Sequence, residues 1–139
     1  MPRDTSTGKV HEAMIRAGLE AGGYQIDEQT QVGTRPNGRK HMVDLIATLN
    51  DDSFLISLKW QQVNGTAEQK IPFEAICLSE ALRQSHPKYD KAYIVLGGEG
   101  WTLKDFYTSA DFLPHLNLSH PISVLRTDQF IAFANQKKL

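Results

Sequence analysis

The sequence has few of the features that mark membrane, secreted or metal-cluster proteins. Its one cysteine, Cys77, excludes an internal disulfide framework and a zinc site built from several cysteines. No apolar run approaches the roughly 20 residues that a membrane-spanning helix needs. Residues 1–6 lead into no apolar segment, so we expect no signal peptide and no membrane attachment, and we place the protein in the cytoplasm.

A strong charge of either sign is also missing. Fifteen Lys and Arg residues against sixteen Asp and Glu give a net charge of −1, so any contact with nucleic acid must depend on local patches. The 139 residues are 40% hydrophobic, which is enough for a buried core and argues against disorder. This length predicts a single domain over residues 1–139.

The order of periodic segments predicts an α/β fold with a mixed sheet. Residues 9–19 are predicted to form a helix, because Val10, Ala13, Met14, Ala17 and, just beyond, Ala21 have helical spacing. Thr102 and Asp105 have the spacing of a capping box at a helix start. Further predicted helices span residues 67–83, which Pro72 starts, kinks or restarts, and residues 127–136. The predicted strands span residues 24–32, 41–49, 54–60, 91–96 and 122–125.

Residues 41–60 predict a β-hairpin that brings an acid next to a lysine. Side chains alternate along a strand, so Ser57 and Lys59 share one face, with Leu55, while Phe54, Ile56, Leu58 and Trp60 face the core. On the preceding strand we expect an apolar face of Val43, Leu45, Ala47 and Leu49. A two-residue loop pairs Asp44 with Ser57, and a four-residue loop pairs Asp44 with Lys59.

The pair of Asp44 and Lys59 allows three interpretations. A carboxylate that binds Mg²⁺ beside a lysine suits metal-assisted hydrolysis. The same pair is also typical of a cross-strand ion pair that contributes little. A nucleophile–base pair of Ser57 and Lys59 is less favoured, because a flat strand does not expose the serine sharply. A metal site needs more carboxylates, and the candidates are Glu12, Glu68 and Glu74, the last two competing for one place.

These residues and their flanking segments resemble the PD-(D/E)XK nuclease superfamily. Asp44, in the segment His-Met-Val-Asp-Leu-Ile-Ala, is followed thirteen positions later by Ser57-Leu58-Lys59. The resemblance covers about residues 9–96 and implies a restriction-endonuclease-like core of helix, three strands, helix and strand. It implies that Asp44 binds the metal, that Lys59 is the catalytic lysine and that Glu12 is a helix glutamate near the site.

The sequence departs from that pattern at two positions. Val43 replaces the proline before the aspartate, and Ser57 replaces the second carboxylate. Some restriction enzymes of the superfamily with Ser-x-Lys take the missing acid from the following helix. Residues 70–74 resemble their basic-x-x-x-Glu arrangement, which makes Glu74 the leading replacement and Glu68 the second.

The resemblance implies a metal-dependent DNA endonuclease that acts as a homodimer or larger homo-oligomer. The expected cofactor is Mg²⁺, with Mn²⁺ as a substitute, and the Leu58 carbonyl is an expected ligand. Gln61 is a candidate for binding water, phosphate or a base, or else a polar loop residue. A restriction enzyme, a junction resolvase and a homing endonuclease remain alternatives, as does a non-catalytic DNA-binding or assembly module. The expected DNA contacts are Arg35, Arg39, Lys40, Gln62 and Asn64. For Arg35, Arg39 and Lys40 the alternative is an ordinary solvated turn.

Overall fold

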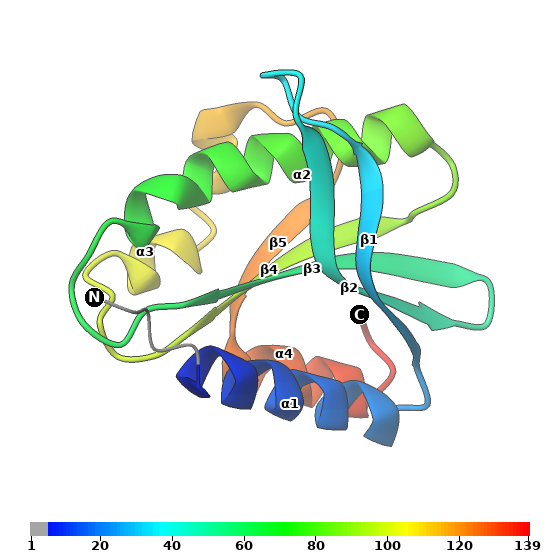
Figure 1. The fold of residues 1–139 in the computed structure, drawn as a ribbon, viewed down its shortest axis with the longest axis horizontal. Helices are drawn as coiled ribbons and strands as arrows, with labels where there is room; N and C mark the ends of the chain where they lie inside the picture. The colour runs from blue at the N-terminus through cyan, green and yellow to red at the C-terminus, as the bar shows by residue number, and fades with distance from the viewer. Residues whose placement is uncertain (1–5) are drawn as a thin grey trace.

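The computed structural model describes residues 6–139 and consists of a five-stranded sheet between two layers of helices (Figure 1). The expectation of no signal peptide concerns residues that lie outside this range. Within it, no helix has the length and apolar character that crossing a membrane requires. The elements are α1 (Ser6–Ala21), β1 (Gln25–Thr34), β2 (Lys40–Leu49), β3 (Asp52–Trp60), the 3-10 helix η1 (Ala67–Lys70), α2 (Ile71–Ser85), β4 (Lys91–Gly97), α3 (Lys104–Tyr107), the 3-10 helix η2 (Leu113–Leu116), β5 (Ile122–Arg126) and α4 (Thr127–Asn135).

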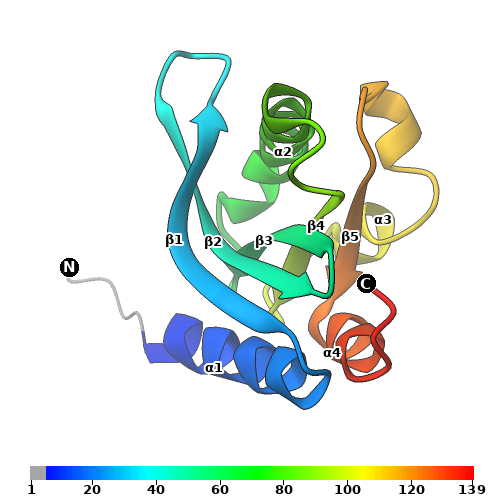
Figure 2. The same ribbon diagram turned by 90° about the vertical axis from the view of Figure 1, so that its right-hand side faces the viewer.

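The strands lie in chain order across one mixed sheet. β1, β2 and β3 are antiparallel neighbours, and β3, β4 and β5 run parallel to one another. Helix α2 covers one face of the sheet, and α1 and α4 cover the other (Figure 2). The predicted α/β class and the predicted order of helix, three strands, helix and strand are confirmed.

The hairpin of β2 and β3 has the shorter of the two predicted loops. Leu49 pairs with Asp52 and Leu45 with Ile56, so Asn50 and Asp51 form a two-residue turn. Asn50 has a φ of +56°, which suits the left-handed turns that match the twist of paired strands. The hairpin therefore directs Asp44 and Ser57 to the same level of the sheet.

Both faces of the sheet are buried against helices. Phe54, Ile56 and Leu45 pack with residues of α1 and α4, whereas Leu55 and Ile46 pack with residues of α2. Burial on two faces accounts for the nearly continuous apolar sequence of these strands.

The predicted alternation of β2 fails at Asp44. Val43 is expected on the face of Leu45, yet it packs with Ile46 in the cluster under α2. The β2–β3 pairs end at Leu45, so the strand is free to change its twist at the next residue. Asp44 therefore lies at an irregular point of the strand rather than in the middle of a regular ladder.

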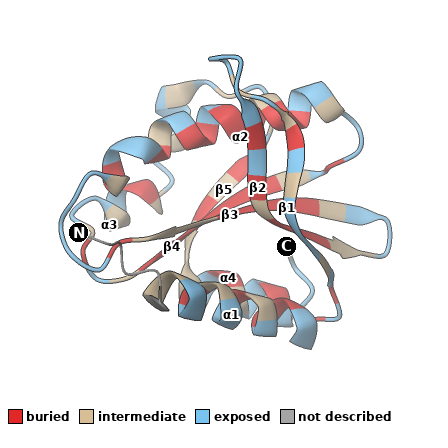
Figure 3. Ribbon diagram, viewed as in Figure 1, coloured by how far each residue is buried: buried red, intermediate tan, exposed pale blue. Residues whose placement is uncertain are grey.

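The predicted first helix is present as α1, but the apolar side chains whose spacing predicts it are not the ones that it buries. Val10 and Met14 are 58% and 48% exposed, whereas His11, Ile15 and Leu19 are at most 1% exposed. Figure 3 shows the exposed outer side of α1 and its buried side toward the sheet. The helix has two apolar stripes, and contact with α4 selects the one with the larger side chains.

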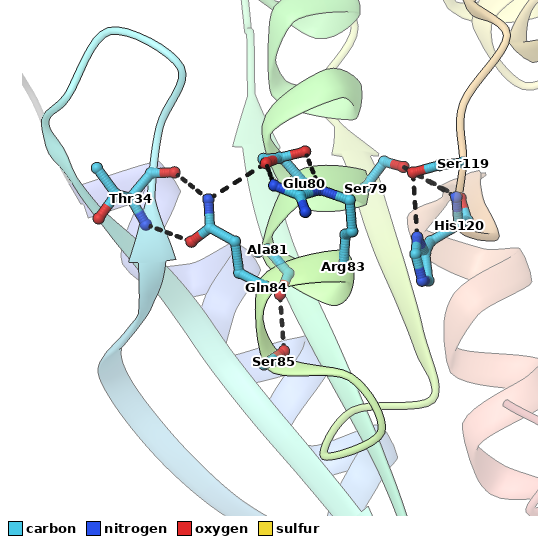
Figure 4. A network of polar contacts seen from close by, with 9 residues as sticks. All are labelled: Thr34, Ser79, Glu80, Ala81, Arg83, Gln84, Ser85, Ser119 and His120. Atoms are coloured by element: carbon cyan, nitrogen blue, oxygen red, sulfur yellow. Dashed lines mark hydrogen bonds and ion pairs between the residues drawn. The ribbon is translucent and has the colours of Figure 1, made fainter.

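Polar contacts on both sides hold α2 across the sheet (Figure 4). The Gln84 side chain accepts a hydrogen bond from the Thr34 amide at 3.0 Å and donates one to the Thr34 carbonyl at 2.9 Å. On the other side, the His120 amide donates to Ser79 Oγ at 3.0 Å. These contacts join the end of β1, the helix and the segment before β5, and so fix the helix that carries Glu74.

Two helix starts differ in how well the sequence predicts them. Pro72 lies in the first turn of α2, directly after η1, so the predicted restart at the proline is confirmed. The predicted capping box at Thr102 and Asp105 is wrong. The short helix α3 begins at Lys104 without a side-chain cap, Thr102 binds Glu68, and Asp105 pairs with Arg126.

Candidate active site

The carboxylate of Asp44 is held at the end of the β2–β3 ladder. The Leu58 amide donates a hydrogen bond to Asp44 Oδ2 at 2.7 Å, beyond the last paired residues of the two strands. On the other neighbour, β1, Gln29 lies between the partners of Val43 and Leu45 and has a φ of +44°. Asp44, with irregular backbone on both sides, faces a cavity beside the inner strands β2 and β3.

Asp44 and Lys59 line the same cavity, which we call the Asp44 cavity. Its volume is about 630 Å³, and Glu12 reaches it from α1. The sequence expectation that Asp44, Lys59 and Glu12 lie together therefore agrees with the geometry. The other lining residues come from the start of α1, from β1 and β3, and from η1: Thr7, Gly8, Lys9, Gln29, Leu58, Trp60, Ala67 and Lys70.

Burial dominates the titration of Asp44. Removal from water raises the pKa of its carboxyl group, as does the charge of Glu74, while the Leu58 amide and the charge of Lys59 partly oppose the shift. When a cation binds a carboxylate that is costly to ionise in the free protein, it stabilises the ionised form. This is the electrostatic setting of a metal ligand or an acid–base group.

Glu74 lies in a separate, buried cluster with three basic side chains. Its Oε2 is 3.3 Å from Arg35 and 3.8 Å from Lys59, and its Oε1 is 3.4 Å from His41 Nε2. The His41 contact is an ion-pair distance without hydrogen-bond alignment, and neither ring nitrogen has a hydrogen-bond partner within residues 6–139. Lys59 thus connects the Glu74 cluster with the Asp44 cavity.

The cations around Glu74 keep it ionised despite its burial. Desolvation by itself would raise the pKa of this carboxyl group, but contact with His41 and the charges of Lys59 and Arg35 outweigh it and lower the pKa to about 2. Both oxygens are occupied by these contacts, and Glu74 is not among the residues that line the Asp44 cavity. The geometry is that of a structural ion-pair network that includes Lys59.

Glu68, the other candidate from the following helix, caps a loop. Its carboxylate accepts hydrogen bonds from the Thr102 and Leu103 amides, the latter at 3.0 Å, and from Thr102 Oγ1 at 2.7 Å. The Thr102 hydroxyl and these two amides lower its pKa against the opposing effect of burial. Glu68 therefore joins η1 to the segment before α3 and does not line the Asp44 cavity.

Gln61 is buried and holds the loop after β3. Its Nε2 donates to the Gly100 carbonyl at 2.7 Å, and its backbone carbonyl accepts from the Gly100 amide at 2.8 Å. Its side chain therefore fits the alternative of a structural loop residue. Gln62 and Asn64 follow it in the same loop and are exposed, which leaves them accessible to a ligand.

The basic turn between β1 and β2 divides into two parts. Arg35 pairs with Glu74, whereas Arg39 and Lys40 are exposed. The turn closes on itself, with the Arg35 amide donating to the Arg39 carbonyl at 2.8 Å. Two of the three predicted phosphate-binding cations are thus accessible, and the third stabilises the buried cluster.

The donors in the Asp44 cavity fit a hard divalent cation that keeps several waters. Asp44 and Glu12 supply carboxylate oxygens, and Leu58 lines the same cavity. Among residues 6–139, no three His, Cys, Asp or Glu side chains gather as ligands for one ion. Two carboxylates suit Mg²⁺, which binds few protein ligands, better than they suit Zn²⁺.

Sequence patterns missed several residues of this cavity. Lys9 and Lys70 add two cations to Lys59, and Gln29 and Trp60 complete the wall. The basic residue before α2 is visible in the sequence, and so is the tryptophan after Lys59. The contribution of Gln29 depends on a backbone conformation with positive φ, for which the sequence gives no signal.

The fold and this site define a class of protein: a mixed sheet between helices with an aspartate and a lysine of neighbouring strands at one cavity. The chain belongs to the PD-(D/E)XK nuclease superfamily, because the model of that superfamily's domain matches residues 3–138. Among curated proteins, none matches the sequence.

Solved structures that resemble this one include the following two. The small subunit of the heterodimeric restriction endonuclease R.BspD6I superposes with a TM-score of 0.50 and 15% identity, over 91% of this chain and 66% of that subunit. A protein of unknown function, AF1548, has a TM-score of 0.49 and 10% identity, over 84% of this chain and 56% of that one. The chain thus spans between half and two thirds of each, and the similarity to the restriction enzyme subunit supports the restriction-endonuclease-like fold.

Proposed function

We propose that this protein is a metal-dependent endonuclease that hydrolyses phosphodiester bonds in DNA. The observation that carries the proposal is that Asp44 and Lys59, the two residues that match the superfamily pattern, line one cavity together with Glu12. An ordinary surface ion pair does not require a cavity of about 630 Å³ or a carboxylate with a raised pKa.

Asp44, Glu12 and the Leu58 carbonyl would hold Mg²⁺, for which Mn²⁺ would substitute. Such an ion supplies charge that stabilises the transition state and activates water for attack on phosphorus. We assign the second carboxylate to Glu12, because Glu74 faces three basic side chains and Glu68 binds two amides. This assignment changes the order of preference that the sequence pattern favours.

Lys59 would place its ammonium group beside the reacting phosphate. There it would orient the attacking water or offset the negative charge that develops on the phosphate oxygens. Its contact with Glu74 at 3.8 Å restricts where the ammonium group lies. Gln61 would act indirectly, by holding the loop that follows Lys59.

DNA would bind over the surface where the Asp44 cavity opens. The exposed residues Arg39, Lys40, Gln62 and Asn64 would contact the backbone, while Arg35 would stabilise the site from within. The described residues of one chain form the Asp44 cavity, and cutting both strands of a duplex calls for two such sites. We therefore propose a homodimer or larger homo-oligomer.

A second candidate is a non-catalytic DNA-binding or assembly module. Ser57, at the position of the second carboxylate, is 3% exposed and offers no charge to a metal. If Glu12 does not complete the metal site, the fold and the DNA surface would remain while hydrolysis would be lost.

Cleavage of supercoiled plasmid and of branched DNA tests the proposal. Both substrates are incubated with the protein in Mg²⁺, in Mn²⁺ and in EDTA. We expect cutting in either metal and none in EDTA. Asp44→Asn and Lys59→Ala should lower the rate at least about a hundredfold, which is the scale of losing one transition-state interaction.

Exposed residues of the same types provide the controls. Asp52→Asn, at the hairpin turn, and Lys138→Ala, near the C-terminus, change the same charges outside the cavity and should cut at the wild-type rate. No cutting by the wild type in either metal, with DNA binding intact, would favour the non-catalytic module. Cutting that survives Asp44→Asn would refute the assigned site.

A further inference from the structure

Trp60 lines a second cavity as well as the Asp44 cavity. This Trp60 cavity has a volume of about 600 Å³ and lies between α1, α4 and the ends of β3 and β4. Its volume is within the range of small-molecule sites in proteins. Because one side chain belongs to both walls, the two cavities lie next to each other.

The wall of the Trp60 cavity is mostly apolar. Met14, Leu96 and Ile131 supply aliphatic surface from three different elements. His11 and Thr127 are already paired with each other, Nε2 to Oγ1, at 2.8 Å. Burial, and secondarily the charge of Lys104, lowers the pKa of His11 to about 4, so its ring is neutral at physiological pH. The cavity thus favours an uncharged group with an extensive apolar surface.

Trp60 itself is placed for stacking. Its ring lies against His11, with centroids 5.3 Å apart, and its indole N–H is buried without a partner among the described residues. Gly97 makes this position available, because a Cβ there would come within 2.6 Å of His11 Nε2 and 2.8 Å of the Trp60 ring.

The charges near the two cavities suit a phosphate backbone with a base attached. Lys9, Lys59 and Lys70 line the Asp44 cavity, where the phosphate would lie. The Trp60 cavity is lined by Lys104, Arg126 and Asp128, so it carries less positive charge than the Asp44 cavity does through its lysines. Cations beside an apolar, aromatic wall form the combination that binds single-stranded nucleic acid.

We propose that the Trp60 cavity binds one unstacked nucleobase of a DNA strand whose phosphodiester lies in the Asp44 cavity. The inference rests on the proposed nuclease function and names its substrate class. That class is DNA with an unpaired base beside the cleaved bond, as in mispaired, branched or single-stranded DNA. A fully paired base is stacked on both faces. It must be unpaired and unstacked before it enters the cavity, and this step costs free energy.

The test compares two duplexes that differ at one position. Each contains 2-aminopurine, either paired with thymine or mispaired, and binding is measured in EDTA so that no metal-dependent cutting occurs. We expect the wild type to bind the mispaired duplex about tenfold more tightly, since stacking of a base on an aromatic ring is worth about 1–3 kcal/mol. The 2-aminopurine fluorescence should change on binding of that duplex alone.

A variant that fills the cavity provides the structural arm of the test. Ala132 lies on α4, is exposed and lines the cavity, so Ala132→Trp should fill it without disturbing the core. Ala17→Trp, on the exposed side of α1, is the matched control. We expect Ala132→Trp to remove the preference for the mispaired duplex, to leave affinity for the paired duplex unchanged and to melt at the wild-type temperature.

Two results would overturn the inference: equal affinity of the wild type for both duplexes, or an equal loss for both in Ala132→Trp. The proposed nuclease function fails in a different way. Preference for the mispaired duplex without metal-dependent cleavage would leave the base cavity in place and refute the nuclease. Metal-dependent cleavage without any preference for the mispaired duplex would support the nuclease and refute the base cavity.

Discussion

The carboxyl group of Asp44 is partly buried. This burial makes its ionised form costly in the free protein and favours the binding of a cation. Its pKa is raised because the charged form loses hydration, and the Leu58 amide and Lys59 do not fully compensate. Above the raised pKa the ionised group therefore destabilises the folded protein. A bound cation would remove that cost, which couples metal binding to stability.

We predict that Asp44→Asn stabilises the metal-free protein at neutral pH. Asparagine keeps an acceptor for the Leu58 amide and carries no charge, so it avoids the cost of desolvating a carboxylate. At about pH 3, below both the folded and the unfolded pKa of the aspartate, the two proteins should have equal stability. Thermal melts in EDTA across this range measure the difference, with Asp52→Asn as the exposed control.

Added Mg²⁺ should reverse the order of stability. The wild type should melt at a higher temperature when the ion is present, and Asp44→Asn should not respond. A wild type that is the more stable protein in EDTA at neutral pH would contradict this account of Asp44.

At the scale of elements, the hairpin and the first helix are predicted, but the buried face of that helix is not. The two-residue turn at Asn50-Asp51 follows from short-range preferences and from the pattern of apolar residues. In α1, by contrast, both the stripe with Val10 and Met14 and the stripe with Ile15 and Leu19 are apolar. Packing against α4 decides between them, and that contact joins opposite ends of the chain.

Helix α2 carries Glu74, which the sequence pattern favours as a metal ligand and which the fold surrounds with basic side chains. The basic partners of Glu74 come from the turn after β1, from β2 and from β3, as Arg35, His41 and Lys59. No spacing along α2 reveals them. A sequence pattern identifies which carboxylates are near a site, but their partners in the fold determine what each one binds.

We predict that Glu74 makes the protein sensitive to acid. Its pKa of about 2 lies below the ordinary value of 4.5, so its contribution to stability is complete above about pH 4.5 and is lost as the pH falls toward 2. Glu74→Gln should lower the free energy of unfolding by about 3 kcal/mol at pH 7. The deficit should disappear near pH 2.

Denaturant unfolding at several pH values measures this effect. Glu80→Gln is the matched control on the same helix, because Glu80 pairs with Arg83 at the surface and should contribute under about 1 kcal/mol. A Glu74→Gln protein as stable as the wild type at pH 7 would show that the Glu74 cluster does not support the fold.

At the scale of the whole molecule, the element order, the sheet and the placement of Asp44 and Lys59 at one cavity follow from the sequence and its resemblance to the superfamily. The irregular backbone at Gln29 and Asp44 and the cavity beyond Trp60 do not. Both depend on contacts among segments far apart in the chain. The net charge of −1 also hides the exposed basic turn between β1 and β2.

We predict that this turn provides part of the electrostatic affinity for DNA. Replacing Arg39 and Lys40 with alanine should weaken binding of all DNA sequences alike. It should also reduce the slope of log K against log salt by the amount that corresponds to about two phosphate contacts. Lys137 and Lys138, replaced in the same way, should leave the slope unchanged. A slope that both double variants share with the wild type would exclude the turn from the DNA surface.

The central claim is that the Asp44 cavity is a magnesium site, and calorimetric titration of the DNA-free protein with Mg²⁺ tests it most directly. Wild type, Asp44→Asn, Glu12→Gln, Glu74→Gln and Glu68→Gln are titrated at neutral pH. The account predicts binding by the wild type, Glu74→Gln and Glu68→Gln, and loss of binding in Asp44→Asn and Glu12→Gln. Absence of binding by the wild type, or binding that Asp44→Asn retains, would contradict it.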